Sequence, residues 1–150
     1  GWAMFAAVDW LYSRLPVRFP NLRICLSEGG VGWVSGLLAR LDHVTRYHQI
    51  YGTWTGIDLS PREVMQRNFW FCAIDDPSGL EHRHRIGIDH VLLESDYPHQ
   101  DGSWPDTQAL LHEQIGSFPA DDIQKLSWAN ASALFSFPVP PAVQADPDAF

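Results

Sequence analysis

Three short apolar segments of this chain each end in acidic residues, and segments with helical patterns lie between them. The apolar segments are 22–27, 68–74 and 90–95. Strands that alternate with helices pair in parallel through right-handed crossovers, so the carboxyl ends of the strands lie at one edge of the sheet. The acids that we expect at this edge are Glu28, Asp75, Asp76 and Asp96.

The acids at the predicted sheet edge suggest a cation. Carboxylates held close together repel one another and raise each other's pKa unless a cation or a proton lies among them. A divalent metal ion is the simplest way to neutralise this repulsion. Asp96 follows a buried segment, where it could bind such a metal or act as general base toward a metal-bound water. Capping of the following turn is the alternative role. Glu94 should point to the same face as Asp96, because strand side chains alternate.

The loop after the third apolar segment holds further candidates. His99 and Asp101 are placed either to bind metal or substrate or to hold a surface loop by its own hydrogen bonds. Trp104 belongs either to the core or to the wall of a pocket. His82 and His84 have the spacing of a metal pair, but they do not end a strand. Their flanks predict a short helix, on which residues two apart point in different directions, so we interpret them as part of a solvated basic patch.

The remaining pattern predicts helices and a tail. Pro16 is expected to end the first helix. Ser60, Pro61 and Glu63 form a capping box that predicts the start of a short helix. The proline-rich, acidic stretch 138–150 is expected to be extended or disordered, which leaves 1–137 as the folded domain. The other predicted helices are 2–15, 34–51 with Gly52 as its C-cap, 80–86, 105–115 and 120–134.

Composition narrows the classes of function. The net charge is -8 and the basic residues are scattered, so no nucleic-acid partner is expected. No apolar run approaches the ~20 residues that a membrane span needs, and the apolar N-terminus lacks the basic flank of a signal peptide. Cys25 and Cys72 each fall inside a predicted strand, which favours two core thiols in a reducing compartment, the cytoplasm, over a disulfide or a metal pair.

Several motifs resemble the amidohydrolase-related family, which includes aminocarboxymuconate-semialdehyde decarboxylase and related decarboxylases and hydrolases. The resemblance runs from about residue 17 to about residue 140. The motifs are Ser27-Glu28-Gly29-Gly30, Asn68-Phe69-Trp70-Phe71, Ser95-Asp96-Tyr97-Pro98-His99, and Asn130-Ala131 before Leu134-Phe135.

This resemblance implies an α/β fold, the C-terminal part of a TIM-type (β/α)₈ barrel with parallel strands in sequential order. The three apolar segments would be strands six to eight, and Asp96 would be the aspartate that completes a site for one divalent metal, zinc or manganese. Two departures stand out. Glu28 occupies a position where the family commonly has histidine, and the first five strands, with the other metal ligands, are absent. A complete barrel needs roughly 200 residues or more.

The leading hypothesis is part of a metal-dependent hydrolase or decarboxylase that acts on a small carboxylic or cyclic substrate. Asp96 would be metal ligand and catalytic base, Glu28 a second catalytic group, and the substrate contacts would be Asp75, His99, Asp101 and Trp104. The alternative is a non-catalytic assembly or ligand-binding module, whose open sheet edges favour a homo-oligomer or a separate N-terminal half as partner. A third possibility, a small doubly wound α/β domain, differs in strand order.

Overall fold

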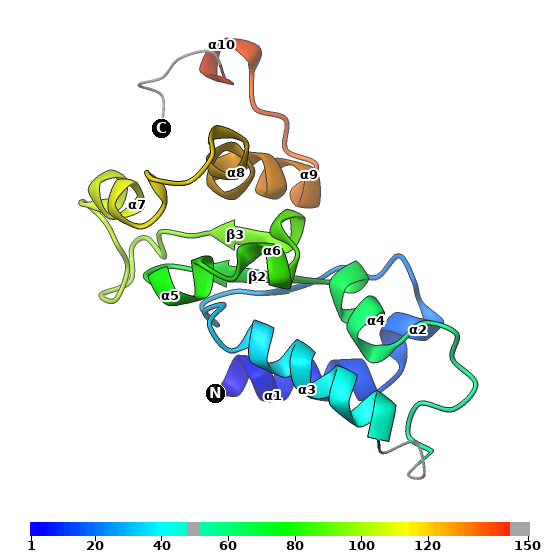
Figure 1. Ribbon diagram of the computed structural model, residues 1–150. Helices are drawn as coiled ribbons and strands as arrows, with labels where there is room; N and C mark the ends of the chain where they lie inside the picture. Colours follow the sequence, from blue (N-terminus) through cyan, green and yellow to red (C-terminus); the bar gives the residue numbers. More distant parts are fainter. Residues whose placement is uncertain (48–51, 145–150) are drawn as a thin grey trace.

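The computed structural model describes residues 1–47 and 52–144, which form three parallel strands surrounded by helices (Figure 1). The strands β1 (Ile24–Leu26), β2 (Phe69–Ala73) and β3 (Val91–Leu93) lie in the order β1-β2-β3. Both neighbouring pairs are parallel. The predicted sequential order is therefore confirmed. A doubly wound sheet reverses its order at a switch point, and these strands show no reversal.

Helices lie on both sides of the strands. In Figure 1, α1, α3 and α4 gather on one side, whereas α8 and α9 lie beside β3. A 3₁₀ turn at Ile88–His90 precedes β3, and a π-helical turn at Lys125–Ala129 joins α8 to α9. The helices are α1 (Trp2–Tyr12), α2 (Leu15–Arg18), α3 (Val34–Tyr47), α4 (Pro61–Asn68), α5 (Pro77–Leu80), α6 (Arg83–Ile86), α7 (Thr107–Ile115), α8 (Ala120–Gln124), α9 (Asn130–Phe135) and α10 (Pro141–Gln144).

Four predictions of local structure need correction, and one of them is the helix at 80–86, which is divided into α5 and α6. The first helix ends before Arg14, whose φ of +61° breaks it, and Pro16 lies in the first turn of α2, where its missing N–H breaks no helical hydrogen bond. The single helix predicted at 120–134 is interrupted by the π-helical turn. The tail is not extended throughout, because α10 lies within it. The last four residues predicted for the helix at 34–51, numbers 48–51, fall outside the described residues.

The main core lies on the face of the sheet that packs against α1, α3 and α4. Phe69, Phe71 and Ala73 alternate along β2 and are almost completely buried there. The opposite face is covered more thinly, by a small cluster in which Cys72 and Leu92 pack with helix α9. The other fully buried side chains of the main core include Leu11, Val34, Leu38, Val64, Met65, Leu80, Ile86 and Val91.

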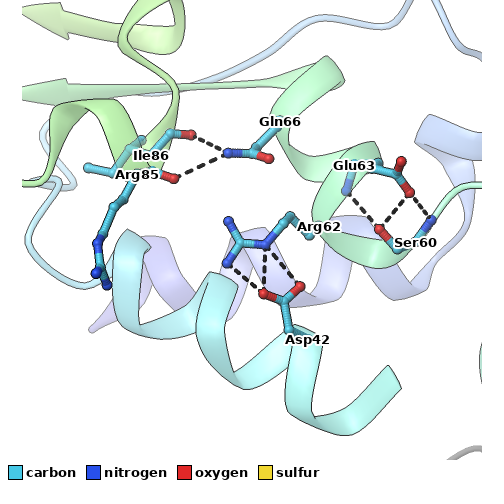
Figure 2. Close-up of polar contacts among 7 residues, drawn as sticks. All are labelled: Asp42, Ser60, Arg62, Glu63, Gln66, Arg85 and Ile86. Carbon is cyan, nitrogen blue, oxygen red and sulfur yellow. Dashed lines mark hydrogen bonds and ion pairs between the residues drawn. The ribbon is translucent and has the colours of Figure 1, made fainter. Parts of the chain in front are cut away.

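Polar contacts join α4 to its neighbours (Figure 2). The Arg62 guanidinium forms an ion pair with Asp42 of α3, with nitrogen–oxygen distances of 2.7 to 2.9 Å. The Gln66 amide donates to the carbonyls of Arg85 and Ile86 at the end of α6. Since α4 runs directly into β2, these contacts fix the point at which β2 begins.

The predicted capping box at the start of α4 is confirmed. The Ser60 hydroxyl accepts from the Glu63 N–H, and the Glu63 carboxylate accepts from the Ser60 N–H at 2.7 Å. Hydrogen bonds from the Ser60 hydroxyl and N–H lower the pKa of Glu63. Pro61 occupies the first helical turn, where no N–H is needed.

Candidate functional site

The candidate site lies where β1 and β3 end. Both strands point their carboxyl ends to the same edge of the sheet, and the chain leaves them through Ser27-Glu28-Gly29 and Glu94-Ser95-Asp96. Glu28 and Asp96 both have left-handed backbones, with φ of +56° and +53°. Such conformations cost non-glycine residues on the order of 1–3 kcal/mol and cluster at functional sites. The left-handed turns after β1 and β3 therefore make this sheet edge a candidate functional site.

Glu28, Asp96 and His99 converge into one group. Each side chain offers one nitrogen or oxygen atom of a kind that binds metals, and these atoms all lie within 4.8 Å of one another. His99 Nδ1 lies 2.9 Å from Asp96 Oδ1. The Asp96 side chain is only 9% exposed, and its Oδ2 atom has no hydrogen-bond partner among the described residues. A buried carboxylate oxygen normally has a partner, so this oxygen, with a second carboxylate and an imidazole beside it, is suited to bind a divalent cation.

Glu94 holds the turn at Glu28. Its carboxylate accepts a hydrogen bond from the Glu28 N–H, with a nitrogen–oxygen distance of 2.5 Å. Because β2 lies between β1 and β3, this contact passes over the end of β2 and joins the two strand ends that carry the candidate ligands. Burial raises the pKa of Glu94 above its ordinary value. The sequence predicted that Glu94 and Asp96 share a face of the sheet. It did not predict the contact of Glu94 with Glu28, because nothing in the residues around either glutamate indicates it.

The acids after β2 are not part of this group. Asp76 accepts hydrogen bonds from the N–H groups of Val31, Gly32 and Gly79, at 2.6 to 2.9 Å. It therefore fixes the loop after β1 and caps α5. A Cβ on Gly79 would lie 2.6 Å from Asp76 Oδ1, so only glycine fits there. Asp75 is exposed and lies outside the three-residue group. Of the four acids that the sequence predicted at this edge, only Glu28 and Asp96 therefore belong to the group.

The loop that follows Asp96 presents aromatic side chains to solvent. Tyr97 and Trp104 pack edge to face with ring centres 5.4 Å apart, and about two thirds of each is exposed, at 64% and 65%. The Ser103 N–H donates to the Ser95 carbonyl at 2.9 Å and closes the loop. Asp101 is exposed in the same loop. Trp104 is thus a surface residue, so its assignment to the core, which the sequence favoured, is wrong.

Among the cavities of the described chain are two of similar volume, one of which adjoins the site. It has a volume of about 390 Å³ and is lined by residues 27–29 and by the start of α1. The other, of about 440 Å³, lies between the end of α1 and the start of α4 and includes none of the predicted site residues. His82 and His84 also lie elsewhere, at α6, where His84 Nε2 contacts Asp122 at 2.8 Å.

Fold and site together define an α/β protein with a carboxylate–histidine group at the ends of parallel strands. The chain belongs to the amidohydrolase family, because the protein-family model described as Amidohydrolase matches residues 2–137 of its sequence. No curated protein matches the chain significantly. Among the described residues, no helix is long and apolar enough to cross a membrane.

Among the solved structures that are similar to this chain are two that match it over most of its length. An amidohydrolase from Mycobacterium avium subsp. paratuberculosis K-10 is 25% identical with a TM-score of 0.69, and the match covers 85% of this chain and 32% of that one. A 5-carboxyvanillate decarboxylase from Sphingomonas paucimobilis is 24% identical with a TM-score of 0.71, covering 87% of this chain and 38% of that one. The chain thus spans about a third of the length of these proteins, and its fold is similar to part of an amidohydrolase barrel.

Proposed function

We propose that this chain supplies the sixth, seventh and eighth strands of a metal-dependent hydrolase or decarboxylase, with Asp96 as metal ligand and general base. The observation that carries this proposal is the convergence of Glu28, Asp96 and His99 around a buried carboxylate oxygen that lacks a partner. Membership of the amidohydrolase family supports the reaction class. The likeness to a decarboxylase of 5-carboxyvanillate is consistent with a small carboxylic or cyclic substrate.

The side chains have distinct roles in this proposal. A divalent ion, when bound, activates water or polarises a substrate carbonyl. His99 Nδ1 orients the Asp96 carboxylate through the contact with Oδ1, which leaves Oδ2 to bind metal or accept a proton. Glu28, which is exposed, offers a second carboxylate toward the substrate. Residues at the rim of the strand ends would contact substrate: Asp75, Asp101 and Trp104.

Substitution of Asp96 by alanine is expected to abolish tight metal binding. The substitution removes the most buried ligand of the group, so the loss of zinc or manganese affinity should be at least the ~10–100-fold that loss of an outer-shell partner costs. Metal content by inductively coupled plasma mass spectrometry, and a calorimetric titration with each ion, would measure this on the purified 150-residue chain.

Asp89→Ala is the matched control for this measurement. Asp89 precedes β3, at the opposite end of the same strand, and forms an exposed ion pair with Lys125. This variant should bind metal as the native chain does. Binding that survives Asp96→Ala, or a native chain that takes up neither ion, would contradict a three-residue site within this chain.

A second candidate function is assembly with another chain, and the exposed aromatic face of α1 favours it. Trp2, Phe5 and Trp10 are 89%, 61% and 40% exposed, although all are large apolar side chains. The outer edges of β1 and β3 are also unpaired within the described sheet. We therefore expect a homodimer or a higher oligomer in sedimentation velocity at micromolar concentration. A monomer across that range would contradict the assembly role.

A further inference from the structure

The two cysteines of the chain lie side by side on neighbouring strands. Cys25 is in β1 and Cys72 in β2, and their Sγ atoms are 3.6 Å apart. Cys25 lies opposite Trp70 in the ladder, and Trp70 and Cys72 share a face because side chains alternate along a strand. Both thiols are free. Adjacent thiols on the thinly covered face of the sheet form a pair that the metal-site proposal does not use.

The two thiols have different surroundings. Cys25 is half-buried, whereas Cys72 is only 5% exposed. The hydrogen bond between them lowers the pKa of Cys25 and raises the pKa of Cys72, and burial raises the pKa of Cys72 further. Partial burial and the nearby Glu94 carboxylate raise the pKa of Cys25, but they offset the lowering by the hydrogen bond only in part. The more accessible thiol is therefore the one that ionises, and the buried thiol stays protonated beside it.

We propose that Cys25 is an oxidation-sensitive thiol and Cys72 its resolving partner, so that a hydroperoxide converts the pair into a disulfide. In the first step the Cys25 thiolate attacks the peroxide. An S–O bond forms, the O–O bond breaks, and the products are a Cys25 sulfenic acid and an alcohol or water. In the second step the Cys72 sulfur attacks the Cys25 sulfur, so that an S–S bond forms and the S–O bond breaks, and the hydroxyl leaves as water with the proton of the Cys72 thiol. The two thiols lose two electrons in total, which reduce the peroxide.

The geometry suits the second step. The sulfurs are separated by 3.6 Å, roughly 1.6 Å more than a disulfide bond of about 2.05 Å. Cys72 lies two residues beyond the ladder partner of Cys25, so closure of the bond combines side-chain rotation with a small movement of the strand backbones. A sulfenic acid with a thiol at this distance condenses to a disulfide before it is oxidised further. The Ser27 hydroxyl, at 4.0 Å from Cys72, also lies near the reacting sulfurs.

The test is oxidation of the reduced, purified chain with hydrogen peroxide, followed by unfolding, alkylation with iodoacetamide and mass spectrometry. The native chain should lose roughly 2 Da and take up no iodoacetamide, and dithiothreitol should reverse the change. Peptides that contain Cys25 and Cys72 should be linked before reduction. Circular dichroism before oxidation checks that each variant is folded.

Single substitutions separate the roles of the two thiols. In Cys72→Ser, and in Cys72→Ala in case serine disturbs the buried position, Cys25 should stop at the sulfenic acid and be trapped by dimedone. In Cys25→Ser, Cys72 should stay reduced at the same dose. The proposal is overturned if native Cys25 proceeds to sulfinic acid while Cys72 stays reduced. It is also overturned if the disulfide forms between chains, or if both thiols still react with iodoacetamide after a dose that oxidises free glutathione.

Discussion

Replacement of Asp122 by alanine is expected to lower the free energy of unfolding by about 3–5 kcal/mol. Asp122 Oδ2 lies 2.7 Å from Arg83 Nε, and each side chain is only 11% exposed. The Arg83 guanidinium also stacks on the Phe118 ring, 3.6 Å from its centre, so it cannot turn out to solvent without losing that contact. Alanine would leave a buried positive charge without its partner. Urea unfolding followed by circular dichroism would measure the loss.

Asp121→Ala is the control for this substitution. Asp121 precedes Asp122 in the first turn of α8 but is exposed. Its negative charge interacts favourably with the helix N-terminus, an effect of about 0.3–1 kcal/mol, so this variant should lose no more than that. Equal losses for the two variants would show that burial of the ion pair is not what stabilises α8 against α6.

The same ion pair should appear in the pH dependence of stability. Burial tends to raise the pKa of Asp122, but hydrogen bonds from Arg83 and His84 outweigh burial and hold the pKa below its ordinary value. A depressed folded-state pKa contributes stability that is present above the unfolded pKa, about 3.9, and is lost as pH falls through the folded pKa. From pH 4 downward, the native chain should therefore lose more stability than Asp122→Ala, and parallel curves would contradict this.

Features set by local sequence were the ones that could be predicted. The capping box at Ser60 depends on residues within one turn of each other, and the structure confirms it. The strands follow from apolar runs bounded by turns, and their parallel pairing follows from the helices between them. Their sequential order was implied by the resemblance to the amidohydrolase-related family, since a doubly wound sheet also has helices between its strands. The placement of Glu28 and Asp96 at one sheet edge needs only that the strands be parallel.

Features set by partners distant in the sequence could not be predicted. Asp75 and Asp76 are adjacent acids after the same strand, and only Asp76 is engaged, by N–H groups 44 and 45 residues away. The proximity of Cys25 to Cys72 depends on the register of β1 against β2, which neither strand reveals alone. The sharp backbone turn at Asp96 likewise depends on the loop that follows it, which Ser103 closes.

Asn68→Ala should lower the free energy of unfolding by about 3 kcal/mol, because it removes a completely buried amide and leaves two partly buried carbonyls without donors, each at a cost of about 1–3 kcal/mol. The Asn68 side chain is completely buried, and its amide donates to the carbonyls of Pro20 and Leu22, at 3.0 and 2.7 Å. These carbonyls precede β1, so the amide holds the beginning of β1 against the beginning of β2. Thermal and urea unfolding would measure the loss.

Gln66→Ala tests whether burial is the reason. Gln66 lies two residues earlier, and its amide also donates to two carbonyls, but one of these contacts is exposed (Figure 2). Water can replace an exposed donor, so this variant should lose only about 1 kcal/mol. Equal losses would mean that the amide bridges stabilise the fold irrespective of burial. A large difference would show that the bridge at the amino ends of β1 and β2 stabilises the fold because the Asn68 amide is buried.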